Sequence, residues 1–162
     1  MKYILILGRD PSLSMAELDS YFFARKIKFK ILRKSDVGLV VEMSSALNFK
    51  KIIKELGGVQ KIAKVVDDFA NLYLGGKGKL KYAISNYTEK DVSGLKDDLK
   101  GYFKQEKIKA MLKKSHHKQD YLNPSEAQNV LELVVFDRYV GKTIAIFNPK
   151  DHKDRDLKRP SQ

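Results

Sequence analysis

The chain has 162 residues, no cysteine and a formal net charge of +12 at pH 7. The length allows one ordinary domain or two small ones, and the lack of cysteine excludes disulfides, thiolate zinc sites and cysteine nucleophiles. No apolar run approaches the roughly 18 residues of a membrane span, and residues 1–7 lack a signal-peptide cleavage site. We therefore expect a cytoplasmic protein with no membrane partner. Its charge favours polyanions such as RNA, the alternative being a lysine-rich proteome adapted to heat or salt.

The first 66 residues predict the order strand, helix, strand, strand, helix, strand. Runs of β-branched and aromatic residues predict the strands, at residues 3–7, 29–32, 37–43 and 59–66. This order is that of the ferredoxin-like fold. We therefore predict an α+β protein whose ferredoxin-like domain spans residues 1–69.

Two apolar stripes predict the helices of this domain. Ser14 and Glu17 have the spacing of a capping box, so the first helix is expected to begin at Ser14, after a break at Asp10-Pro11. The second helix has its apolar residues on one face, at Phe49, Ile52, Ile53 and Leu56.

Residues 70–148 predict a second α/β domain. Its strands are expected at residues 80–84, 108–112, 131–136 and 142–147. Thr88 is predicted to cap a helix with an apolar stripe that includes Leu95 and Leu99, and a hairpin turn is expected over residues 137–141. Residues 149–162 have too few apolar side chains to pack and predict a linker, which we expect to lead toward a catalytic domain absent from this chain.

Positive charge concentrates between residues 100 and 118. Seven lysines stand there against one acid, Glu106, at positions 100, 104, 107, 109, 113, 114 and 118. If a helix ends near Lys107 and a strand follows, these lysines gather at one end of the second domain and neutralise phosphates. The alternative is a solvated helix face whose lysines favour the helix dipole.

No complete catalytic set accompanies this charge. Gly141-Lys142-Thr143 lacks the preceding glycine of a phosphate-binding loop and favours a hairpin turn. His116 and His117 are adjacent, have no acidic cluster beside them and do not predict a metal site. No glycine-rich loop predicts a nucleotide cofactor. Whether the chain is itself an enzyme stays open.

Several segments in series resemble a known family. Residues 79–87 (KLKYAISNY) resemble the strand that opens the body of THUMP domains, and residues 122–129 (LNPSEAQN) resemble the loop after its basic strand. Residues 141–146 (GKTIAI), with Arg155-Asp156 and Arg159-Pro160, resemble the end of THUMP and the following linker in archaeal-type tRNA guanosine N2-methyltransferases. The first 66 residues are similar to the ferredoxin-like domain that precedes THUMP there.

The resemblance implies that the two domains hold tRNA, with THUMP, here residues 70–148, taking the acceptor stem and its 3′ end. A separate domain in that family binds S-adenosylmethionine and methylates a guanine, so no cofactor is expected in this chain. We expect phosphate contacts from Lys104, Lys107, Lys109, Lys113, Lys114 and Lys118. Contacts with terminal nucleotides are expected from His116, His117 and Asn129. The family prefers arginine where Lys109 stands, which leaves phosphate attraction intact but not bidentate contacts.

Two other functions stay open at this point. THUMP with a ferredoxin-like neighbour also occurs in 4-thiouridine synthetases, although Arg155-Asp156 and Arg159-Pro160 favour the methyltransferases. A non-catalytic ferredoxin-like module that binds protein is the remaining alternative, and its RNA binding would be absent or insensitive to salt.

Overall fold

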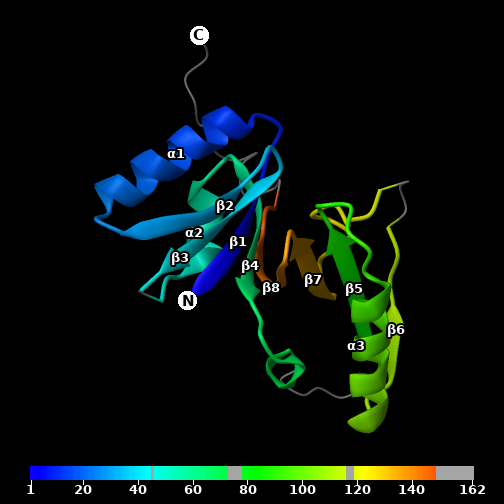
Figure 1. Ribbon diagram of the computed structural model, residues 1–162. Coiled ribbons are helices and arrows are strands. Elements are labelled where there is room, and N and C mark those ends of the chain that lie inside the picture. The colour runs from blue at the N-terminus through cyan, green and yellow to red at the C-terminus, as the bar shows by residue number, and fades with distance from the viewer. Residues whose placement is uncertain (45, 73–77, 116–118, 149–162) are drawn as a thin grey trace. The chain divides into compact units, whose positions relative to one another are not determined.

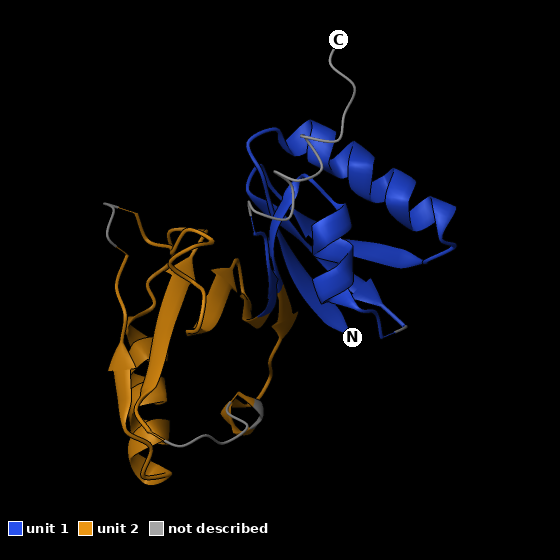
Figure 2. Cartoon of the chain, turned by 180° about the vertical axis from the view of Figure 1, so that it is seen from behind, with its two compact units in different colours: residues 1–62, 144–162 blue, residues 63–143 orange. Residues whose placement is uncertain are grey.

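A computed structural model of the protein describes residues 1–44, 46–72, 78–115 and 119–148 (Figure 1). Within these ranges, three α-helices and eight strands form a mixed α+β fold. The chain divides into two compact units, Met1–Ile62 with Ile144–Gln162, and Ala63–Thr143 (Figure 2). The domain boundary was expected after residue 69, whereas the units change inside a continuous strand, β4 (Val59–Val65).

The first unit has the predicted order of strands and helices. Its elements are β1 (Lys2–Leu7), α1 (Pro11–Ala24), β2 (Phe29–Lys34), β3 (Gly38–Met43), α2 (Phe49–Glu55) and β4. Hydrogen bonding gives the strand order β2-β3-β1-β4, and β3 is antiparallel to both β1 and β2. Alternate residues of β1 (Tyr3, Leu5 and Leu7) share one apolar cluster with residues of both helices, so α1 and α2 cover the same face of the sheet.

The predicted start of α1 at Ser14 is wrong, because Asp10 caps the helix instead. The Asp10 carboxylate accepts a hydrogen bond from the Leu13 amide at 3.1 Å, and Pro11 occupies the first helical turn, where its missing N–H costs nothing. The carboxylate of Glu17 accepts from the Gly57 amide at 2.6 Å, so this residue ties α1 to the end of α2 rather than closing a capping box.

The second unit contains a parallel crossover followed by a hairpin. Its elements are a 3-10 turn (Phe69–Asn71), β5 (Leu80–Asn86), α3 (Ser93–Gln105), β6 (Ala110–Leu112), β7 (Leu131–Phe136) and β8 (Tyr139–Ile146). The strand order is β8-β7-β5-β6, with β5 parallel to β6 and β7, and β7 antiparallel to β8. The predicted stripe of α3 is confirmed, since Leu99 and Phe103 pack against Tyr82 and Leu133.

Two further local predictions in this unit are wrong. Thr88 does not cap α3, because its hydroxyl accepts a hydrogen bond from the Asp137 amide at 3.0 Å, and the residue before the helix is Val92. The hairpin turns at Asp137-Arg138, where Asp137 has a φ of 54°, rather than through Gly141, which lies within β8. An aspartate tolerates this left-handed conformation, so the turn needs no glycine.

Helices α1 and α3 end in the same way, with a lysine in the left-handed conformation. Lys26 and Lys107 each have a φ of 56°. The next amides, of Ile27 and Ile108, donate at 2.9 and 2.8 Å to the carbonyls of Phe22 and Phe103. These are the hydrogen bonds of a Schellman motif, usually built with glycine. The motif turns the chain from α3 directly into β6.

We predict that Gly58→Ala destabilises the first unit. A Cβ at residue 58 would stand 2.5 Å from Oγ and 2.9 Å from Cβ of Ser14, which is buried in α1. The overpacking should cost about 1–3 kcal/mol of unfolding free energy in urea titrations. Gly57→Ala is the matched control, because its new Cβ meets nothing nearer than 3.9 Å. Equal stability of the two variants would contradict the close packing of Gly58 on Ser14 of α1.

Candidate nucleic-acid interface

The crossover β5–α3–β6 determines which residues of the second unit meet at one edge. Leu80 pairs with Ala110 and Tyr82 with Leu112, so β5 and β6 run in the same direction. A helix that joins two parallel strands runs back against them. The first turn of α3 therefore lies beside the residues that follow β6.

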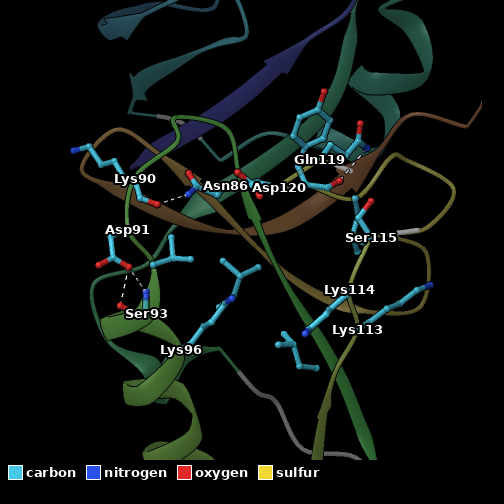
Figure 3. Close-up of a pocket in the computed structure, with 15 residues that line it drawn as sticks. Asn86, Lys90, Asp91, Ser93, Lys96, Lys113, Lys114, Ser115, Gln119 and Asp120 are labelled. Carbon is cyan, nitrogen blue, oxygen red and sulfur yellow. Dashed lines mark hydrogen bonds between the residues drawn. The ribbon is translucent and has the colours of Figure 1, made fainter. Parts of the chain in front are cut away.

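A pocket of about 540 Å³ opens at this edge (Figure 3). Its walls come from the end of β5, the start of α3, the segment after β6 and the loop of residues 119–122. Within the described part of the chain, four lysines and two aspartates are its charged lining residues: Lys90, Lys96, Lys113, Lys114, Asp91 and Asp120. A basic lining of this kind attracts anions, and the positive end of the α3 dipole adds to it.

Two of these lysines turn their side chains into the pocket. In Figure 3, Lys96 and Lys114 approach its middle from opposite sides, one from α3 and the other from the segment after β6. The other two are engaged elsewhere: Lys90 Nζ lies 3.2 Å from Asp137 Oδ1, and Lys113 Nζ donates to the Glu126 carbonyl at 2.9 Å. Lys96 and Lys114 are therefore the pocket ammonium groups best placed to bind an anion.

One aspartate of the pocket is held at the start of α3. Asp91 Oδ1 accepts hydrogen bonds from the hydroxyl and the amide of Ser93, at 2.7 and 2.9 Å. These two bonds, with a smaller contribution from Lys96, lower the pKa of Asp91 below its usual value. Asp91 thus remains ionised at neutral pH and offsets part of the positive charge.

The loop beyond the pocket is stabilised by a reciprocal capping arrangement. Asn123 Oδ1 accepts from the Glu126 amide at 2.8 Å, and Glu126 Oε1 accepts from the Asn123 amide at 3.1 Å. Lys113 then binds this turn, because its Nζ donates to the carbonyl of Glu126. Asn123 and Glu126 thus have the three-residue spacing of a capping box. This spacing is visible in the sequence, although no capped turn was predicted from it.

A buried carboxylate ties the same loop to the sheet. Glu132, on β7, is 1 % exposed, and its two oxygens accept from Ser85 Oγ at 2.5 Å and from Thr143 Oγ1 at 2.6 Å. Ser85 Oγ in turn accepts from the Leu122 amide at 3.0 Å. The glutamate within the apolar run of residues 131–136 was the sequence signal for this network, which fixes the pocket wall to β5.

Two aromatic rings stack at the rim of the pocket. Tyr87 and Tyr121 have ring centroids 4.4 Å apart and an interplanar angle of 19°. Burial raises the pKa of the Tyr87 hydroxyl, and the charge of Glu132 raises it further. Tyr121 lines the pocket and is 36 % exposed, so it offers aromatic surface on a supported ring.

The structure does not gather the predicted lysine cluster at one end of the unit. The carbonyl of Lys109 accepts from the Leu80 amide, whereas the Lys113 amide donates to the carbonyl of Tyr82, so these lysines lie at opposite ends of β6. The three residues of β6 lie between them, and four steps of extended chain amount to about 13 Å. Of the predicted residues whose positions are described, Lys113 and Lys114 line the pocket.

The other predicted site residues lie elsewhere. The second half of α3 and the segment before β6 carry exposed lysines, here called the α3-end lysines: Lys100, Lys104, Lys107 and Lys109. Asn129 is exposed and has a φ of 60°. His116, His117 and Lys118 lie outside the described residues. Lys96 was missed because charge counting along the chain does not show which lysine the crossover brings beside Lys114.

Within the described ranges, no helix combines the length and the apolar character of a membrane span. No group of three or more histidine, cysteine, aspartate or glutamate side chains in those ranges could hold a metal ion.

Comparisons with known proteins identify a similar fold. The sequence matches no protein-family model and no curated protein. The crystal structure of PH1313 from Pyrococcus horikoshii Ot3 is similar, with a TM-score of 0.51 and 12 % sequence identity. The match covers 87 % of this chain but 53 % of that one, so this chain spans about half the length of PH1313. At this identity the likeness concerns the fold alone.

We predict that Ser85→Ala loosens the pocket wall. The change removes a donor to the buried Glu132 and the acceptor of the Leu122 amide, which should lower the unfolding free energy by roughly 2–3 kcal/mol. Ser125→Ala is the control, because the exposed Ser125 hydroxyl donates a hydrogen bond within its own loop, to Asn123 Oδ1 at 2.8 Å, and its loss should cost less than about 1 kcal/mol. Urea denaturation measures both, and equal losses would contradict the role of the network.

Proposed function

We propose that this chain is the RNA-binding part of an S-adenosylmethionine-dependent tRNA guanine-N2 methyltransferase. The first unit is its ferredoxin-like domain, and the second is its THUMP domain, which takes the acceptor end of tRNA for a catalytic domain outside this chain. The observation that carries the proposal is the pair Lys96 and Lys114, which turn into one pocket from separate segments.

The charge of the second unit supports a polyanionic partner. Besides the pocket pair, the exposed α3-end lysines present a second group of ammonium groups at the far end of β6. Lysines neutralise backbone phosphates without reading sequence. Two separated basic groups suit an extended RNA better than a single small anion, because consecutive phosphates along a strand reach both.

The fold supports the family assignment of both units. The first unit has the βαββαβ order of ferredoxin-like domains. The second contains the strand, crossover helix and hairpin expected from the resemblance of residues 79–87, 122–129 and 141–146 to THUMP. The similarity to PH1313 is consistent with this family assignment at the level of fold.

The mechanism of such a part is positioning rather than bond making. A tRNA is rigid, so fixing its acceptor end sets the distance from the protein to every other base. A catalytic domain attached or bound at the right place then meets one guanine in a suitable orientation, which lowers the entropic part of the barrier. S-adenosylmethionine would bind to that domain, and this chain alone should transfer no methyl group to tRNA.

Three double charge reversals test the proposal, since each changes the net charge equally. We expect K96E/K114E to weaken tRNA binding at low salt by about tenfold or more and K104E/K107E by several-fold, because each removes two phosphate contacts. Glutamate at position 96 lies in the first turns of α3, where the dipole favours it. Filter-binding titrations with intact tRNA measure these affinities.

K26E/K28E is the matched control on the first unit. Lys26 and Lys107 share the same left-handed position after a helix, so one substitution of K26E/K28E and one of K104E/K107E fall on the same kind of backbone. Equal weakening by all three variants would indicate attraction to net charge alone and would contradict a site on the second unit. A tRNA lacking its single-stranded 3′ tail should bind more weakly than intact tRNA.

A further inference from the structure

We infer that the pocket at the end of β5 and β6 receives one unpaired nucleotide, with its phosphate between Lys96 and Lys114 and its base against Tyr121. The inference rests on the proposed function, because it says which part of the RNA this pocket takes. Phosphate contacts alone would need only the exposed lysines. Tyr121 lines the same pocket and is 36 % exposed, and this aromatic surface indicates that a base enters as well.

Tyr121 has the surroundings of a stacking platform. Its ring lies nearly parallel to that of Tyr87, with 4.4 Å between centroids, and Tyr87 is itself partly buried. This support fixes the plane of the Tyr121 ring, so little conformational entropy is lost when a base stacks on it. Proteins that bind single-stranded nucleic acids combine such rings with a positively charged groove. A base inside a duplex is already stacked on its neighbours, so this surface favours an unpaired one.

The wall that carries Tyr121 is held on both sides. On one side, the neighbouring Leu122 amide donates to Ser85, which in turn binds the buried Glu132. On the other, Lys113 binds the carbonyl of Glu126 in the capped turn. A ligand therefore meets a wall anchored before it binds, and the volume of about 540 Å³ lies in the range of small-molecule sites.

The charge balance indicates how much phosphate the pocket accepts. Among the lining residues that the structure describes, Asp91 and Asp120 share it with the lysines, and Lys90 is already paired with Asp137. The remaining excess suits the single negative charge of one phosphodiester. A triphosphate would bring more negative charge than Lys96 and Lys114 balance. The pocket is therefore suited to a nucleotide within a strand or at its end, and less to free ATP.

The test compares hexaadenylate with an abasic oligonucleotide of the same length, using the full chain. In amide NMR titrations, hexaadenylate should shift the signals of Ser93, Lys114 and Leu122, which line the pocket, whereas the abasic oligonucleotide should shift Leu122 less. Tyr121→Leu should weaken hexaadenylate binding roughly tenfold. Tyr121→Phe keeps the ring and should bind as the unchanged protein does. ATP should compete poorly.

Three outcomes would overturn the inference. These are equal affinity for hexaadenylate and the abasic oligonucleotide, equal affinity of the Tyr121→Leu and Tyr121→Phe variants, or tighter binding of ATP than of hexaadenylate. The titration of the unchanged protein decides the first even if Tyr121→Leu fails to fold. Failure of the proposed function looks different, because tRNA affinity would then not respond to K96E/K114E. If tRNA binding responds to K96E/K114E but hexaadenylate binding does not depend on Tyr121, only the nucleotide assignment is lost.

Discussion

The parallel pairing of β5 with β6 is the constraint on which the rest of the second unit depends. It requires α3 to run back along the strands, and it thereby brings the first turn of the helix beside the segment after β6. Lys96 and Lys114, which are far apart in the sequence, face one pocket for this reason. The same geometry places the α3-end lysines at the other end of β6. One crossover thus produces both basic groups.

The pocket depends on a second constraint, which is the satisfaction of buried polar groups. A carboxylate as buried as that of Glu132 is costly unless hydrogen bonds compensate it. The hydroxyls of Ser85 and Thr143 donate hydrogen bonds to it, and Ser85 Oγ also accepts one from the Leu122 amide. The loop around Tyr121 is therefore part of the folded core of the unit. Its position does not depend on a ligand.

Much of the fold could be predicted because apolar periodicity is a local signal. The stripe that includes Leu99 and the apolar run at residues 131–136 identified α3 and β7. Helix starts were less predictable, since several capping residues stand within a few positions of one another. Ser14 and Thr88 both had suitable side chains, but tertiary contacts use them otherwise. Ser14 packs against Gly58, just before β4, and Thr88 binds the hairpin at Asp137.

The candidate site was predictable only in part, for a related reason. Counting charge along the chain identified Lys113 and Lys114 but grouped them with Lys104 and Lys107, which lie at the other end of β6. Strand direction decides this separation, and no local pattern specifies it. The role of Lys113 also depends on a distant partner, the Glu126 carbonyl, and this contact makes it a support of the loop rather than a free cation.

The central claim is that lysines of the second unit bind the phosphates of RNA. The salt dependence of tRNA affinity tests it most directly, because each phosphate neutralised by the protein releases condensed counterions. We predict that log K falls linearly with log salt concentration, and that the slope becomes shallower by about two in K96E/K114E. An affinity that does not change with salt, or a slope unaffected by the two substitutions, would contradict the account.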